Sequence, residues 1–384
     1  MHNSFIVSTF AENLTDMAKV NTFSTRYIIE NAPLIFHKNR WAHGIVVCPY
    51  CGSVHIHEYG DYTYKCNSCK ARFSDKTRTL MHGSKLPVSV WMQAVYEMTV
   101  DNRISSTVLA VKLGINQKSA WLIQAKLRYS MDVDDVTLSG QIAQDEMYIG
   151  GCLTNYHYGR KLRLLRENNL MGEEDTRYTK SAVYALNSRL KQPVFGMNDG
   201  ERIVLYATPN PIRKEYIHHI YKKHVVGESV SISDESKLYD NWEEVTGSPI
   251  YTNNHHNNQY KTEGGLTSNR IENTFSWYKR GFAARTTHCK EKYLQLYLNE
   301  FCFRYNTRHL SHEERFGEAI NRMTRKSVTY KDIRAYNPFE PFGKNRKRRR
   351  HIYTMSDIKE MFEENSLIAS IRFGETVYTR KDFE

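Results

Sequence analysis

Three acidic residues lie far apart along the chain, each beside an element that can hold it in a fixed position. Asp145 lies within residues 141–149, which predict a strand that Gly150 and Gly151 stop. Asp234 directly follows a second short strand, and Glu272 lies early in a long helical region, residues 268–308. A buried carboxylate is costly without a compensating cation, and carboxylate oxygens are the hard ligands that Mg²⁺ prefers. We therefore interpret Asp145, Asp234 and Glu272 as a candidate site for Mg²⁺ or Mn²⁺.

Converging carboxylates of this kind suit the cleavage of a phosphodiester bond. Two metal ions about 3.5–4 Å apart can stabilise both the attacking and the leaving oxygen. Lys279 follows Glu272 by nearly two helical turns, so both should project from one face, where the lysine could hold a phosphate. Arg280 continues the basic character. Glu146 should point to the opposite face of the strand from Asp145, which predicts an outer position, although an exchange of roles stays open.

Four of the seven cysteines form a second constellation. Cys48 and Cys51 make one C-x2-C pair, and Cys66 and Cys69 make another after 14 intervening residues. Four thiolates complete the tetrahedral shell of a structural Zn²⁺ and leave no ligand position for water. The segment 41–80 therefore predicts a zinc ribbon whose metal is structural. A ribbon alone does not distinguish DNA, RNA and protein as the partner.

The next segment has the layout of a helix-turn-helix. Residues 105–113 predict a short helix with serine at its N-cap, Gly114 supplies a tight turn, and residues 117–128 predict a second helix. The second helix of such a motif can lie in the major groove. The alternative is a plain helical hairpin inside a bundle. The side chains expected to face DNA are Gln117, Lys118 and Lys126.

Composition limits the class of protein. The 384 residues suggest two or three domains. The excess of 54 Lys and Arg over 42 Asp and Glu gives a net charge of +12, which favours a polyanionic partner such as nucleic acid. No run of 18 or more apolar residues is present, which argues against a membrane protein. The odd cysteine count and an N-terminus unlike a signal peptide favour a reducing compartment. We expect a cytoplasmic, nucleoid-associated protein, or a nuclear one in a eukaryotic host.

The order of strands and helices after residue 136 is typical of an α/β fold. Strands are expected at 193–197 and 202–208, separated by a hairpin turn, and Pro211 is expected to open a helix. Residues 247–267 are expected to form a loop, and the helical region after it could break near Gly281. The predicted division is an N-terminal arm at 1–40, the ribbon at 41–80, a helical DNA-binding domain at 81–135, a catalytic domain at 136–310 with a basic, irregular insertion at 152–191, and a basic extension at 311–384.

Four blocks together resemble the ISXO2-like transposases, the IS1595 group of insertion sequences, which are related to Merlin elements. Besides the two cysteine pairs, the blocks are residues 145–151, 193–196, 269–281 and 297–306. The likeness spans roughly residues 30–310. Each block is unspecific by itself, but the combination is specific. The longer insertion and the tail depart from the family pattern.

The resemblance implies an RNase H-like catalytic fold, a DDE-type triad with Mg²⁺, and terminal inverted repeats of double-stranded DNA as the substrate. By position, the triad is Asp145, Asp234 and Glu272, with Lys279 as the associated lysine. Some relatives have asparagine as the third member, so Asn269 and Asn273 also stay candidates. A homodimer is expected by analogy, because joining two element ends generally takes two active sites.

Two other functions are compatible with the sequence. A DNA-binding regulator derived from a transposase would keep binding without cleavage, although every candidate catalytic position is still acidic. An RNase H-like nuclease would act on branched DNA or on RNA.

Overall fold

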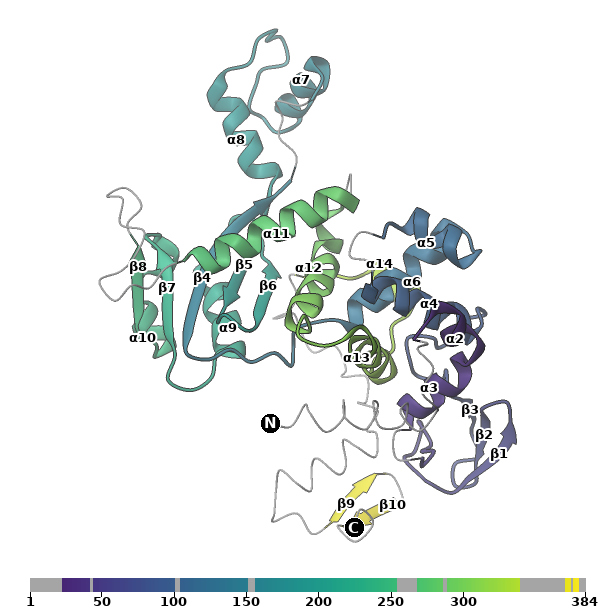
Figure 1. The fold of residues 1–384 in the computed structure, drawn as a ribbon. Coiled ribbons are helices and arrows are strands. Elements are labelled where there is room, and N and C mark those ends of the chain that lie inside the picture. The colour runs from purple at the N-terminus through teal and green to yellow at the C-terminus, as the bar shows by residue number, and fades with distance from the viewer. Residues whose placement is uncertain are drawn as a thin grey trace. The chain divides into compact units, whose positions relative to one another are not determined.

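The computed structural model describes residues 23–41, 44–100, 104–150, 156–253, 268–285, 289–338, 370–373 and 376–379. The chain forms two compact units (Figure 1). One consists of residues 1–131, 307–336 and 343–384, and the other of residues 132–306 and 337–342. Within the described ranges, every helix is too short or too polar to cross a membrane.

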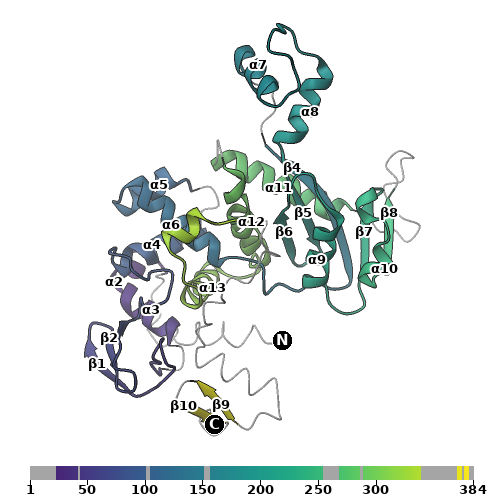
Figure 2. The same cartoon turned by 180° about the vertical axis from the view of Figure 1, so that it is seen from behind.

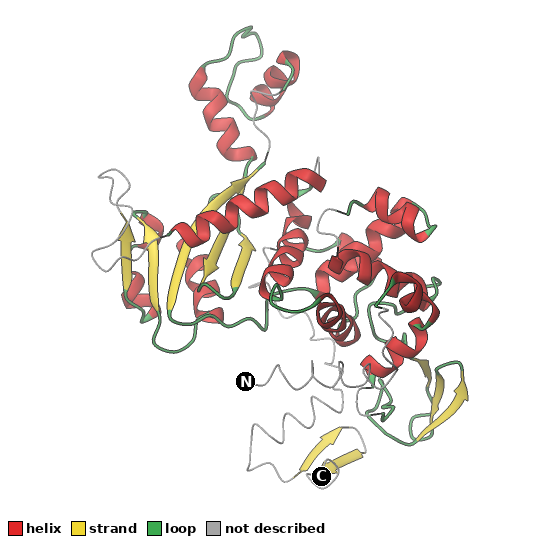
Figure 3. Ribbon diagram, viewed as in Figure 1, coloured by secondary structure: helices red, strands yellow, loops and turns green. Residues whose placement is uncertain are grey.

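The second unit is built on a five-stranded mixed sheet (Figure 3). Its strand order is β6-β5-β4-β7-β8, with β5 antiparallel to β4 and β6, and β7 parallel to β4 and β8. This arrangement agrees with the predicted RNase H-like class, and the three strands expected between residues 141 and 208 are confirmed. β8 lies in the region that was expected to be a loop. The strands are β4 (Gln141–Ile149), β5 (Gln192–Asn198), β6 (Ile203–Ala207), β7 (Val230–Asp234) and β8 (Ile250–Asn253).

Helices cover both faces of this sheet, with α9 and α11 on opposite sides (Figures 1 and 2). α11 packs on β4 and β5, and α12 packs on β6. The helical region does divide into two helices, but the division follows Arg285 and not Gly281, because glycine weakens a helix without interrupting its hydrogen bonds. The helices after the insertion are α9 (Lys214–His224), the 3-10 helix η2 (Lys237–Tyr239), α10 (Trp242–Thr246), α11 (Asn269–Arg285) and α12 (Glu291–Asn306).

Two amide side chains of α12 occupy the outer edge of the sheet. Gln295 accepts from the backbone N–H of Ala207 at 2.8 Å and donates to the carbonyl of Leu205 at 3.0 Å. Asn306 makes the same pair of bonds with the backbone of Ile203, at 2.8 and 3.0 Å. Unpaired backbone groups on an edge strand invite pairing with another chain. The helix therefore closes this edge and explains why polar residues lie within an otherwise apolar helical stripe.

The insertion between β4 and β5 is helical, so the expectation of an irregular segment is wrong. It contains α7 (Tyr158–Glu167) and α8 (Lys180–Leu190). Leu165 and Leu186 are fully buried in a small core of their own, separate from the core of the sheet. In α8, Ala182 and Val183 lie four and three positions before Leu186 and pack against the same core.

The first unit is mostly helical, with a small three-stranded sheet. Ser105 caps α5, Gly114 ends it in the left-handed conformation with φ of 64°, and Asn116 caps α6. The predicted helix-turn-helix layout is therefore confirmed. The elements before residue 131 are α2 (Thr25–Glu30), α3 (Ala32–Arg40), β1 (Ile56–Gly60), β2 (Thr63–Cys66), β3 (Arg72–Ser74), α4 (Val88–Val100), α5 (Ser106–Leu113) and α6 (Gln117–Ser130).

The segment expected to be a C-terminal extension begins with helices that belong to this first unit. α13 (His312–Arg325) packs on α3, α4 and α6, and α14 (Tyr330–Arg334) packs on α6. The ring of Phe316 lies 5.3 Å from that of Phe23, and Leu80 donates its backbone N–H to the carbonyl of Met323. A short hairpin of β9 (Ser370–Phe373) and β10 (Thr376–Thr379) follows. The basic run at 344–350 lies outside the described residues.

Candidate active site and metal centres

Two parallel strands bring two of the predicted acids together. β4 and β7 pair in the register Ala143 to Ile232. Two residues further along each strand are Asp145 and Asp234, the latter being the last residue of β7. Carboxylate oxygens of Asp145, Glu146 and Asp234 all lie within 4.8 Å of one another, and we call these three residues the carboxylate cluster.

Glu146 is the unexpected member of this cluster. The alternation of side chains along a strand placed it on the other face from Asp145, in an outer position. β7 ends at Asp234, however, so no strand backbone of β7 lies beside Glu146. In addition, the hydroxyl of Tyr239 in η2 donates a hydrogen bond to Glu146 Oε1. Neither the end of the strand nor the tyrosine follows from the local sequence pattern, and Tyr239 was not among the predicted site residues.

Crowding and burial disfavour the charged forms of these acids. Burial raises the pKa of Asp145 to about 7, helped by the charges of Glu146, Asp234 and Glu272 and opposed by a hydrogen bond from the backbone N–H of Glu146. Burial also raises the pKa of Glu146 to about 7, with a further contribution from Asp234. A bound cation would relieve this repulsion, since an opposite charge nearby favours the ionised form.

Glu272 approaches the site from α11. It lies outside the carboxylate cluster, although its charge contributes to the raised pKa of Asp145. Its exposed side chain accepts a hydrogen bond from Ser268 Oγ at 3.0 Å. Lys279 and Arg280 are exposed further along the same helix. The structure thus brings Asp145 and Asp234 together and places Glu272 near them.

A glycine allows α11 to lie close to the site. Gly196 of β5 pairs with Asp145 across the sheet, so a side chain at either position would point to the same face. A Cβ atom on Gly196 would come within 2.6 Å of Phe275 and 2.9 Å of Ile271, both on α11. The absence of a side chain at this position sets the distance between the sheet and the helix that carries Glu272.

The donor set of the carboxylate cluster fits a hard divalent cation. All three side chains offer carboxylate oxygens and are half-buried. They converge from two neighbouring strands, β4 and β7. Mg²⁺ and Mn²⁺ prefer oxygen ligands of this kind. Of the described residues, the only other group of at least three potential metal ligands that converges as closely is formed by the cysteines.

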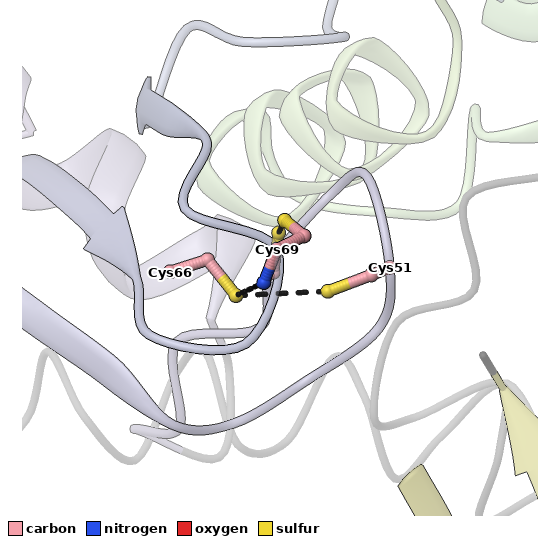
Figure 4. Close-up of side chains that lie close together, drawn as sticks. Cys51, Cys66 and Cys69 are labelled. Carbon is pink, nitrogen blue, oxygen red and sulfur yellow. Dashed lines mark hydrogen bonds between the residues drawn. The ribbon is translucent and has the colours of Figure 1, made fainter. Parts of the chain in front are cut away.

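The four cysteines meet as predicted. Figure 4 shows Cys51, Cys66 and Cys69 of this group. The sulfur atoms of Cys48 and Cys69 are 3.6 Å apart, as are those of Cys51 and Cys66. Burial opposes ionisation of Cys66, but backbone hydrogen bonds from Cys69 and Ser68 and its cysteine neighbours lower the pKa of its thiol to about 7. Four converging thiols on two turns fit the closed tetrahedral shell of a structural Zn²⁺.

The second helix of the helix-turn-helix presents two of its three predicted contact residues. Gln117 and Lys118 are exposed at the start of α6. Lys126 is only 6% exposed, and its Nζ donates to the carbonyl of Leu80 at 2.9 Å, so the prediction that it faces DNA is wrong. Its long aliphatic stem allows a basic residue to lie on the buried face of the helix, beside the ring of Trp91.

Comparison with known proteins agrees with both sites. Residues 137–306 match the family model of the ISXO2-like transposase domain, and residues 30–72 match that of the transposase zinc-ribbon domain. The chain contains an ISXO2-like transposase domain. This transposase domain coincides with the sheet unit that carries the carboxylate cluster. The zinc-ribbon match contains all four converging cysteines.

A curated relative points the same way. The chain is 27% identical over 116 residues to a protein of Halobacterium salinarum described as an uncharacterized protein in transposable element ISH50. The matched segment covers 29% of this chain and 38% of that relative. No solved structure matches the chain.

Proposed function

We propose that this protein is a DDE-type DNA transposase, which binds the terminal inverted repeats of its element, cleaves phosphodiester bonds with the help of divalent metal, and transfers the freed strand to target DNA. One observation carries the proposal: in a chain with an ISXO2-like transposase domain, Asp145 and Asp234 meet at corresponding positions of neighbouring parallel strands. Two acids in that arrangement can share a cation, and the surrounding domain belongs to a family of DNA-rearranging proteins.

The residues of the site are proposed to have different roles in cleavage. Asp145, Asp234 and Glu272 are proposed to hold Mg²⁺ or Mn²⁺. When bound, the metal would supply an activated water and stabilise the charge that develops on the leaving oxygen. Lys279 is proposed to bind a phosphate of the substrate beside the carboxylates, since it is exposed on the helix that carries Glu272. Arg280 would add a further contact to the DNA backbone.

DNA recognition is assigned to the first unit. Gln117 and Lys118 lie exposed at the N-terminal end of α6, the part of a recognition helix that reaches base edges in the major groove. The zinc ribbon, held by Zn²⁺ on its four cysteines, would extend the contact with the element end. A homodimer is proposed by analogy, because two ends are joined in one reaction.

The proposal is tested with a DNA duplex that carries the inverted repeats bordering the gene. With Mg²⁺ present, we expect a strand break at the repeat end that leaves a 3′-hydroxyl. Binding without any cleavage would favour a regulator derived from a transposase. Faster cleavage of four-way junctions or RNA–DNA hybrids than of the repeat ends would favour a nuclease of another specificity.

A further inference from the structure

We propose that Glu146 is an additional metal-binding carboxylate of this site, and that the buried hydroxyl of Tyr239 positions it. The inference rests on the proposed function, because it concerns the same metal site. It assigns a role to Glu146, which the alternation of side chains along β4 would place outside the site.

The position of Tyr239 is fixed by an aromatic cluster. Its ring lies 5.5 Å from that of Trp242, which in turn lies 4.7 Å from the ring of Tyr221 in an edge-on contact. Trp242 is itself held to β7, because its Nε1 donates to Ser231 Oγ at 3.1 Å. A hydroxyl on so constrained a ring can point in few directions, and here it points at Glu146.

The hydrogen bond from Tyr239 selects one orientation of the Glu146 side chain. A carboxylate has two oxygens with about four acceptor sites, so a bond to Oε1 leaves Oε2 free to bind a cation. Ligands that are held by a hydrogen bond from a neighbouring group bind metal more tightly, because their orientation is set in advance. With Glu146 held in this way, its carboxylate lies within 4.8 Å of those of Asp145 and Asp234.

A purely structural role for this contact is the competing explanation. Glu146 could serve only as the acceptor that satisfies a buried tyrosine hydroxyl. In that case, loss of the hydroxyl would change stability and leave metal affinity unchanged. Metal binding therefore separates the two explanations, and cleavage activity is not needed to do so.

The experiment measures Mn²⁺ binding to the full-length, zinc-loaded chain from the free-Mn²⁺ signal in electron paramagnetic resonance. Tyr239→Phe is expected to weaken Mn²⁺ binding by about tenfold or more, the usual effect of losing a ligand's hydrogen-bonding partner. Glu146→Gln removes the charge of the proposed ligand itself and is expected to weaken binding at least as much. Tyr221→Phe is the matched control, since it removes a buried hydroxyl from the same aromatic cluster without touching a carboxylate. It is expected to bind Mn²⁺ as the unmodified protein does.

The outcomes are distinct. Unchanged Mn²⁺ affinity in Tyr239→Phe, or in Glu146→Gln, overturns the inference. Equal weakening by Tyr239→Phe and Tyr221→Phe also overturns it, because the effect would then come from general loosening of the cluster. If Asp145→Asn too leaves Mn²⁺ binding unchanged, the metal site of the proposed function fails as well. If Asp145→Asn loses Mn²⁺ binding but Tyr239→Phe keeps it, the inference about Glu146 fails and the metal site of the proposed function stands.

Discussion

Substituting Gly196 by alanine should disturb the contact between the sheet and α11. The new Cβ would lie 2.6 Å from Phe275 Cε1, 2.7 Å from Leu205 Cδ2 and 2.9 Å from Ile271 Cδ1. All three neighbours are almost fully buried, so none can move into solvent. Overpacking of a dense core costs about 1–3 kcal/mol. In a unit of this size, that corresponds to a fall of about 2–4 °C in melting temperature for each kcal/mol.

Gly281→Ala provides the matched control, because it makes the same chemical change within α11 where no atom lies within 4 Å of the new Cβ. It should be neutral or stabilise the helix by up to about 1 kcal/mol. Thermal unfolding of the full chain, followed by circular dichroism, measures both variants. The reasoning is refuted if Gly196→Ala melts at the same temperature as Gly281→Ala. Cleavage should also fall in Gly196→Ala, because the strained helix carries Glu272.

Three further predictions concern the metals, DNA and pH. Replacing Cys48 and Cys51 by serine should abolish zinc binding and unfold the ribbon, which needs metal to fold; unchanged zinc content by atomic absorption would contradict this. Lys118→Ala should weaken DNA binding and lower its salt dependence by about one ion without loss of stability. Lys126→Ala should instead cost about 1–3 kcal/mol of stability, since it leaves a buried carbonyl unpaired. Equal losses of DNA affinity in the two variants, at unchanged stability, would contradict the finding that Lys118 is exposed and Lys126 buried. Because burial raises the pKa values of Asp145 and Glu146 to about 7 in the folded chain, these two carboxyl groups hold more protons in the folded than in the unfolded chain between about pH 4 and 7. Its melting temperature should therefore fall as the pH rises through this range, and added Mg²⁺ should reduce the fall; a melting temperature that rises instead would show that the cluster is not strained.

Local signals in the sequence were sufficient where short-range geometry decides the structure. The strand at 141–149 was predicted with its correct ends, because Gly150 and Gly151 mark where it stops. The helix-turn-helix was predicted from Ser105 and Gly114, whose capping roles depend only on their immediate neighbours. The cysteine spacing likewise identified the ribbon, since two short turns suffice to present four thiols to one point.

The sequence did not reveal features that depend on contacts between distant segments. Glu146 joins the site because β7 ends beside it and Tyr239 reaches it from 93 positions away. Lys126 is buried because a carbonyl 46 residues earlier accepts its ammonium hydrogen. β8 was not expected because its four residues form a strand only through pairing with β7. In each case, a partner far along the chain outweighs the local pattern.

The account depends most on Asp145 as a metal-binding residue of a DNA-cleaving site. The most direct test compares the unmodified chain with Asp145→Asn on the duplex bearing the inverted repeats, measuring Mg²⁺-dependent cleavage and DNA affinity side by side. Glu167→Gln, a change at an exposed acid of the insertion, is the control. We predict that Asp145→Asn abolishes cleavage and leaves DNA affinity nearly unchanged, while the control retains both. Undiminished cleavage by Asp145→Asn, or an equal loss of binding and cleavage, would contradict the account.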